Sequence, residues 1–154
     1  MQKSKIILET IKSKHNRAYN HLDAYLSNSK DFHYKIDDLE NISFKSMTAL
    51  LYSFFDDNCV FVSLCLQEIN RNGTKWEVSI FIDGKCIKEN DFLNREMAEY
   101  IAFKKAFQFL DTKLFIDMTK NLFYDGSSDS SCLNVDWIHL DKVLTYRRKN
   151  FINE

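Results

Sequence analysis

The apolar positions between residues 46 and 55 recur three and four residues apart, which places them along one face of a helix. Ser46 can cap the first turn of this helix, and the polar run 56–58 can end it. The apolar face consists of Met47, Leu50, Leu51, Phe54 and Phe55. The spacing predicts a short helix over 46–55.

Residues 59–69 alternate in the manner of a strand with two different faces. One face carries Val60, Val62, Leu64 and Leu66, and the other carries Phe61, Ser63, Cys65 and Gln67. Asn72-Gly73 is a favoured pair for a type I′ hairpin turn, since both central positions need a positive φ, and Asp83-Gly84 is a second hairpin signal. Residues 76–82 alternate between the two turns, and a shorter apolar stretch follows over 86–92. The pattern predicts a three-stranded antiparallel meander.

A second helix is predicted from Asn94, which can serve as its N-cap, to about residue 113. Its apolar positions lie on one side, with small residues first and large ones later. They are Ala98, Ile101, Ala102, Ala106, Phe109 and Leu110. Because small alanines let a helix lie close to a sheet, we expect an α+β fold in which residues 46–113 form α-β-β-β-α, with the helices on one face of the antiparallel sheet.

The predicted core, 46–113, is flanked by an N-terminal segment, 1–45, and a C-terminal segment, 114–154. Residues 4–26 have the spacing of one amphipathic helix, and 27–45 indicate a connection with one extended piece over 32–36. The last segment has an apolar stretch at 122–124, a polar loop around Gly126 and a helical pattern over 134–148. We expect the N-terminal helix and the C-terminal extension to pack on the central core.

The composition and charge of the chain argue against several classes of function. The chain of 154 residues is 45% hydrophobic, which is enough for a core, and its net charge of −1 argues against a polycationic nucleic-acid coat or a membrane-surface binder. Basic ends flank an acidic middle: residues 1–20 hold five basic side chains against Glu9. No apolar run approaches the ~20 residues of a membrane span or the pattern of a secretory signal, so we expect an intracellular protein.

Chemistry-bearing residues form no recognisable motif. The four cysteines contain no Cys-x-x-Cys pair, and the four histidines lack the spacing of zinc ligands. The acidic clusters lack the regular spacing of a calcium loop. We therefore expect reduced cysteines, no catalytic residue, no metal site and no cofactor, although side chains distant in sequence can still assemble a site in the fold.

The stretches Trp76–Ile87 and Arg95–Leu110 resemble the second half of a double-stranded-RNA-binding domain. That family shows an aromatic residue with alternating valines, a turn glycine, and a helix that continues through alanines to leucine, and these stretches have Trp76, Val78, Gly84, Ala102 and Leu110. The resemblance covers 46–113 and implies the family's α-β-β-β-α fold. It also implies lysines at the start of the last helix, where this chain has Glu96 and Glu99. Degenerate members of the family commonly dock proteins, which the resemblance implies here.

Two groups of side chains are candidates for such docking. Phe61 and Phe81 fall on the nominally solvent-facing side of the sheet, and the alternative is that the N-terminal helix or the C-terminal tail covers them. Tyr124 and Trp137 flank an acidic loop, an arrangement that could mimic nucleic acid for a basic partner. Core packing is the plainer interpretation of Trp137.

The sequence favours a non-catalytic protein–protein adaptor in a ribonucleoprotein or RNA-processing complex, with a partner that it does not identify. A homodimer also fits. One alternative is direct RNA binding through basic side chains of the last helix and the termini, namely Arg95, Lys104, Lys105, Arg147 and Arg148. Another is a small inhibitor, such as a toxin immunity protein or a phage antagonist of host defence.

Overall fold

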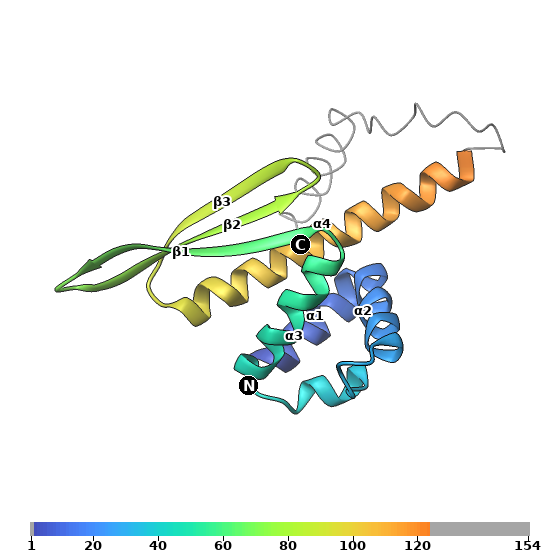
Figure 1. The fold of residues 1–154 in the computed structure, drawn as a ribbon, viewed down its shortest axis with the longest axis horizontal. Helices are drawn as coiled ribbons and strands as arrows, with labels where there is room; N and C mark the ends of the chain where they lie inside the picture. The colour runs from blue at the N-terminus through green and yellow to red at the C-terminus, as the bar shows by residue number, and fades with distance from the viewer. Residues whose placement is uncertain (1, 124–154) are drawn as a thin grey trace. The chain divides into compact units, whose positions relative to one another are not determined.

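A computed structural model describes residues 2–123, and the chain divides into two compact units, Met1–Phe115 and Ile116–Glu154. The described residues form an α+β arrangement of four α-helices, one 3₁₀ helix and three strands. In chain order these are α1 (Lys3–Lys14), α2 (Asn16–Asn28), η1 (Ile36–Glu40), α3 (Phe44–Asp57), β1 (Val60–Asn70), β2 (Gly73–Ile82), β3 (Lys85–Phe92) and α4 (Arg95–Phe123). Figure 1 shows these helices and strands as a ribbon. The last turns of α4 belong to the second unit.

The three strands form an antiparallel sheet in the order β1-β2-β3, as the alternation predicts. Asp83 and Gly84 form the second turn with φ values of 48° and 78°, which confirms the hairpin predicted there. The first turn differs from the prediction. Asn70 pairs with Gly73, so Arg71 and Asn72 are the central residues, and Gly73 begins β2 with a φ of 124°.

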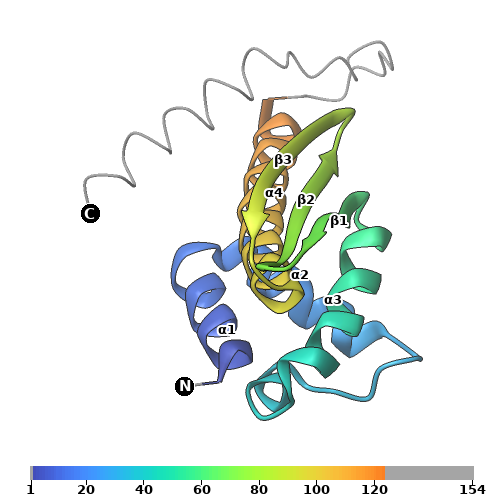
Figure 2. The same ribbon diagram turned by 90° about the vertical axis from the view of Figure 1, so that its left-hand side faces the viewer.

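One face of the sheet is covered by helices. Val60, Val78, Ile80 and Ile82 are buried on this inner face, and α4 runs along it behind β2 and β3 (Figure 2). Four rings from the two long helices meet in the core: Phe54 and Phe55 of α3, and Phe103 and Phe107 of α4. Ala98, Ala102 and Ala106 are fully buried, which confirms that they lie on the apolar side predicted for this helix. The prediction of helices on one face is confirmed for the described residues.

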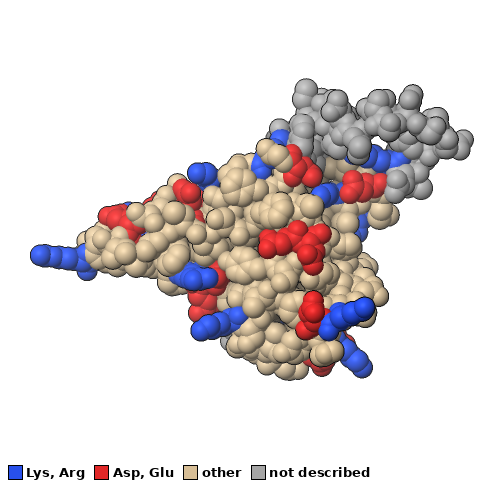
Figure 3. Space-filling view, viewed as in Figure 1, with Lys and Arg blue, Asp and Glu red and all other residues tan. Residues whose placement is uncertain are grey.

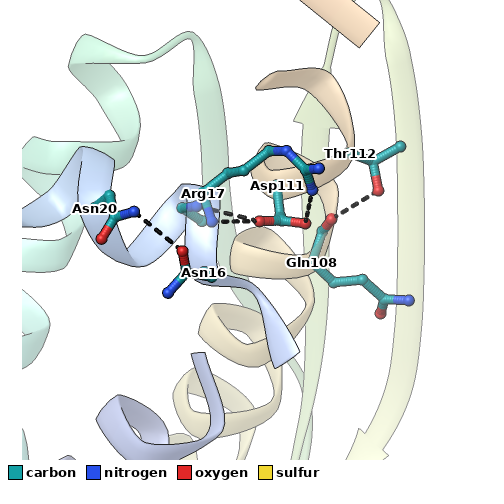
Figure 4. A network of polar contacts seen from close by, with 7 residues as sticks. Asn16, Arg17, Asn20, Gln108, Asp111 and Thr112 are labelled. Atoms are coloured by element: carbon teal, nitrogen blue, oxygen red, sulfur yellow. Dashed lines mark hydrogen bonds and ion pairs between the residues drawn. The ribbon is translucent and has the colours of Figure 1, made fainter. Parts of the chain in front are cut away.

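The N-terminal segment is two helices, and the prediction of one continuous helix over 4–26 is wrong. His15 has φ −133° and ψ 54°, which ends α1 and lets α2 begin in a new direction. The first amides of α2 then need acceptors from elsewhere. Asp111 of α4 supplies one, because its Oδ1 accepts from the amides of Arg17 and Ala18 at 3.0 and 3.2 Å (Figure 4).

The helix ends show which local signals were correct. Asn94 caps α4 as predicted, its Oδ1 accepting from the Met97 amide at 2.8 Å. For α3 the cap is Ser43, whose Oγ accepts from the amide of Ser46, so the helix starts earlier than predicted. Residues 32–35 are in neither helix nor strand, and Ile36 begins η1. The loop and helix predicted between residues 124 and 154 lie outside the described residues.

Candidate functional site

The face of the sheet opposite α3 and α4, here called the outer face, carries the predicted aromatic pair. Phe61 of β1 and Phe81 of β2 are direct cross-strand partners, and Phe81 pairs in turn with Cys86 of β3. The side chains are 49% and 43% exposed, although each neighbours a buried residue along its own strand. Alternation along the strands therefore turns both rings away from the core.

The N-terminal helices do not cover this pair. α1 contacts α2, η1 and α3, so the N-terminal segment packs on the helical side of the molecule. The interpretation that the N-terminal helix shields Phe61 and Phe81 is wrong. The C-terminal alternative, together with Tyr124 and Trp137, lies outside the described residues.

The rows beside the aromatic pair are polar. Ser63, Ser79 and Lys88 stand in register across the three strands, and Lys88 lies 3.5 Å from Glu77. The outer face thus combines two large rings with a polar row whose one charged residue, Lys88, is paired with Glu77. A hydrophobic centre with a polar surround is typical of protein interfaces.

A second apolar surface, which was not predicted from the sequence, lies at the end of the β1–β2 hairpin. Leu66, Trp76 and Phe92 stand in register across the sheet, on the same face as the core, and Leu66 is exposed. Ile69 and Leu93 nearby are 74% and 75% exposed. The strand lengths would have indicated it, because a strand of 11 residues spans about 36 Å and extends past the start of a helix that begins at residue 95.

The start of α4, where the family resemblance implies phosphate-binding lysines, is occupied by acid–base pairs. The Glu99 carboxylate is buried and accepts from Arg95 Nε at 3.0 Å and from the Tyr52 hydroxyl at 3.3 Å. Lys3 Nζ donates to Glu96 at 2.5 Å. Burial, and next the charge of Glu99, raises the pKa of Tyr52. The cations at this end are thus already neutralised within the chain.

A cleft of about 740 Å³ opens beside these pairs, between the first turns of α3 and α4. Tyr52, Arg95, Glu96 and Glu99 line it together with Lys45. Because two carboxylates stand against two cations, the cleft has no net attraction for a polyanion. The Tyr52–Glu99–Arg95 network was not predicted, since Tyr52 lies 47 positions from Glu99.

The remaining basic candidates on α4 do not form a patch with Arg95. Lys105 forms an ion pair with Glu89 of β3, and Lys104 lies over the Tyr100 ring at 5.3 Å from its centroid. Ten helical positions, about 15 Å along the axis, separate Arg95 from Lys105, so these side chains lie on different turns of α4. In Figure 3, acidic and basic groups are interspersed on the visible face of the described part. Arg147 and Arg148 lie outside the described residues.

A second surface cleft, of about 590 Å³, lies between α2 and the end of α3. His21 Nε2 is 2.6 Å from the Asn58 side-chain oxygen, and the Tyr25 hydroxyl donates to Asp57 at 2.8 Å. These polar pairs tie the two helices together. Within residues 2–123, no group of three or more His, Cys, Asp or Glu side chains could hold a metal ion.

Comparison with protein-family models, with curated proteins and with solved structures finds no match to this chain. None of the helices in the described region combines the length and apolar character needed to cross a membrane.

Proposed function

We propose that this chain is a non-catalytic protein–protein adaptor, built on a degenerate dsRBD-like fold and serving a ribonucleoprotein or RNA-processing complex. The order α3-β1-β2-β3-α4 and the antiparallel sheet with both helices on one face support the fold part of the proposal. The RNA-processing setting rests on the sequence resemblance over 46–113.

The observation that carries the docking function is the exposure of Phe61 and Phe81 as neighbours in register on the outer face. Burying a half-exposed phenylalanine against a partner removes apolar surface from water, and each Å² is worth about 25 cal/mol. Aromatic side chains at the centre of an interface also carry a disproportionate share of its binding energy. Two adjacent rings thus form a small anchor for a protein partner.

The charges at the start of α4 support a protein partner over duplex RNA. A phosphate backbone is bound by cations that release counterions. Arg95 is held by Glu99, and Lys3 by Glu96, so an approaching phosphate would meet two carboxylates whose cations are already engaged. The proposal therefore assigns α4's first turns to internal packing and the outer face to binding.

Capture from the native host, followed by titration of the recovered protein, tests the proposal. The Phe61→Ser/Phe81→Ser double variant should lose at least about tenfold in affinity, or about 1.4 kcal/mol. Leu93→Ser, which changes an exposed apolar residue of the β3–α4 connection, is the matched control and should bind as the native chain does. Equal binding by native chain and double variant would reject the outer face as the docking site.

A mobility-shift titration with duplex RNA tests the other half of the proposal. We expect no tight binding that weakens steeply with salt. Tight, salt-sensitive binding would instead favour the nucleic-acid alternative, and Lys104→Glu/Lys105→Glu should then abolish it. The identity of the captured protein separates the adaptor from the inhibitor alternative, because an inhibitor should recover one toxin or defence enzyme.

A further inference from the structure

The two edges of the sheet differ in how they are protected. β1 and β3 are both edge strands, and open edges can pair with another chain. β3 carries charges at four of its eight positions and a register shift near Asp91, whose φ is 69°. Charges and bulges of this kind discourage pairing. The first seven residues of β1, Val60–Leu66, have no charge, proline or glycine and include two valines and a phenylalanine.

The described residues supply no backbone partner to the outer edge of β1. Its ladder is with β2, and the backbone hydrogen bonds outside helices and strands in this part of the chain do not involve residues 60–70. As far as residues 2–123 are concerned, the polar groups along that edge are thus available to another strand.

The inner face is also incompletely covered along β1. Val62 and Leu64 are half-buried and Leu66 is exposed, whereas their partners on β2, Ile80 and Val78, are only 1% and 2% exposed. The helical layer therefore covers the central strand well and the β1 edge poorly. An element added beside β1 would cover this apolar row and satisfy its backbone at the same time.

We propose that β1 pairs antiparallel with β1 of a second copy of this chain, about a two-fold axis at Ser63. In this register Val62 faces Leu64 of the second copy and Phe61 faces Cys65, so apolar inner residues meet each other and outer residues meet each other. No like charges oppose, because the seven paired residues carry none. Centring on Ser63 also keeps the irregularity between Leu66 and Glu68 outside the paired stretch.

The uncharged sequence is what favours a second copy over an unrelated strand. When two copies of one strand pair about a two-fold axis, a residue at the axis faces the same residue of the second copy. A charged side chain there would therefore face a like charge. The pairing would join two three-stranded sheets into one of six strands, with both outer faces on the same side. Two Phe61–Phe81 pairs would then share one surface, although the inference concerns the strand edge and does not depend on the proposed function.

Sedimentation equilibrium of the purified full chain tests the pairing without any partner protein. Ser63→Lys places two lysines against each other at the axis and should weaken dimerisation at least about tenfold. Cys86→Lys, at an exposed outer-face position of β3, is the control and should dimerise like the native chain. A native chain that remains monomeric at about 100 µM, or a Ser63→Lys variant that dimerises normally, would overturn the proposal.

Cross-linking tests the register and the edge. In a chain with its four cysteines changed to serine, Ser63→Cys should form an intermolecular disulfide, because Cα atoms of facing antiparallel residues lie about 4.5–5.5 Å apart. Lys88→Cys is the matched control, since Lys88 stands in the same row as Ser63 but on the other edge strand. Faster cross-linking through residue 88 than through residue 63 would reject β1 as the interface.

Hydrogen exchange separates a second copy from another occupant of the edge. Protection of the β1 amides that rises with protein concentration supports the dimer. Full protection of the same amides in a dilute monomer would mean that another segment of the chain occupies the edge, and this result would overturn the proposal. Neither outcome bears on Phe61→Ser/Phe81→Ser binding, so the two proposals can fail separately.

Discussion

Arg17 and Asp111, 94 positions apart in the chain, make two contacts with each other. The Asp111 carboxylate accepts from the Arg17 backbone amide at 3.0 Å, and its second oxygen lies 3.8 Å from the guanidinium (Figure 4). The carboxylate is 2% exposed, whereas the Arg17 side chain is 37% exposed. Asp111 therefore serves as the acceptor that α2 lacks in its own sequence and fixes α2 against α4.

Removal of this acceptor should be among the most destabilising changes of a polar residue in the chain. Asp111→Ala leaves two amides of α2 without their side-chain acceptor, and we expect a loss of about 2–4 kcal/mol in the free energy of unfolding. Denaturant unfolding followed by circular dichroism measures it. Asp23→Ala, at an exposed position of α2, is the control and should change stability by less than about 0.5 kcal/mol. Similar midpoints for the two variants would contradict the capping role.

The break at His15 shows what a local pattern can and cannot predict. Apolar residues keep helical spacing across residues 4–26, so periodicity indicates a single helix. The acceptor that permits a second helix start is on α4, beyond the reach of any local window. The two-residue turn between β1 and β2 was misplaced for a related reason, because the Asn70–Gly73 pairing depends on the register of the whole ladder. Alternation and capping signals such as Asn94, which act locally, predicted the sheet and the start of α4.

Some features of the candidate site can be predicted from the sequence, and others cannot. The exposure of Phe61 and Phe81 follows from the alternation of side chains between the two faces of a strand, and this alternation can be recognised in the sequence. The network of Tyr52, Glu99 and Arg95 joins two helices and could not be predicted from either one. The acidic residues at the start of α4 could be predicted from the sequence. The basic side chain that pairs with Glu96 could not, since Lys3 lies 93 positions away.

Exposed and buried phenylalanines should differ sharply in their effect on stability. Phe55 is fully buried and touches Phe54, Phe103 and Phe107, so Phe55→Ala should cost about 3–5 kcal/mol. Phe61→Ala removes a ring that is 49% exposed and should cost less than about 1.5 kcal/mol. Thermal unfolding of the two variants measures the contrast. A loss of several kcal/mol for Phe61→Ala would mean that the ring is buried in the folded chain.

Alkaline pH should weaken the fold through Tyr25. Burial, and next the hydrogen bond to Asp57, raises the pKa of Tyr25 from 10.0 to about 12. Since the folded-state pKa is the higher one, the stabilisation is fully present below pH 10.0 and is lost as the pH rises to about 12. The denaturation midpoint of Tyr25→Phe should therefore fall less across this window than that of the native chain.

Tyr34→Phe provides the control for the loss of a phenol, because Tyr34 is exposed and lies outside the contact of α2 with α3. It should keep the full native decrease in midpoint over the same pH window. If the denaturation midpoints of the native chain and of Tyr25→Phe fall equally with rising pH, the Tyr25–Asp57 contact does not couple stability to pH.

Cys59 occupies a position that favours glycine, and its replacement should stabilise the chain. Cys59 directly follows Asn58, the C-cap residue of α3. Its φ is 57°, and its amide donates to the Asp56 carbonyl at 3.0 Å. The left-handed conformation costs an L-residue about 1–2 kcal/mol. Glycine removes that cost but adds about 0.5–1 kcal/mol of conformational entropy to lose on folding. Cys59→Gly should thus gain about 0.5–1 kcal/mol in denaturant unfolding. Cys59→Ala retains the Cβ atom and should gain nothing, so a glycine variant no more stable than the alanine variant would show that strain at this position is negligible.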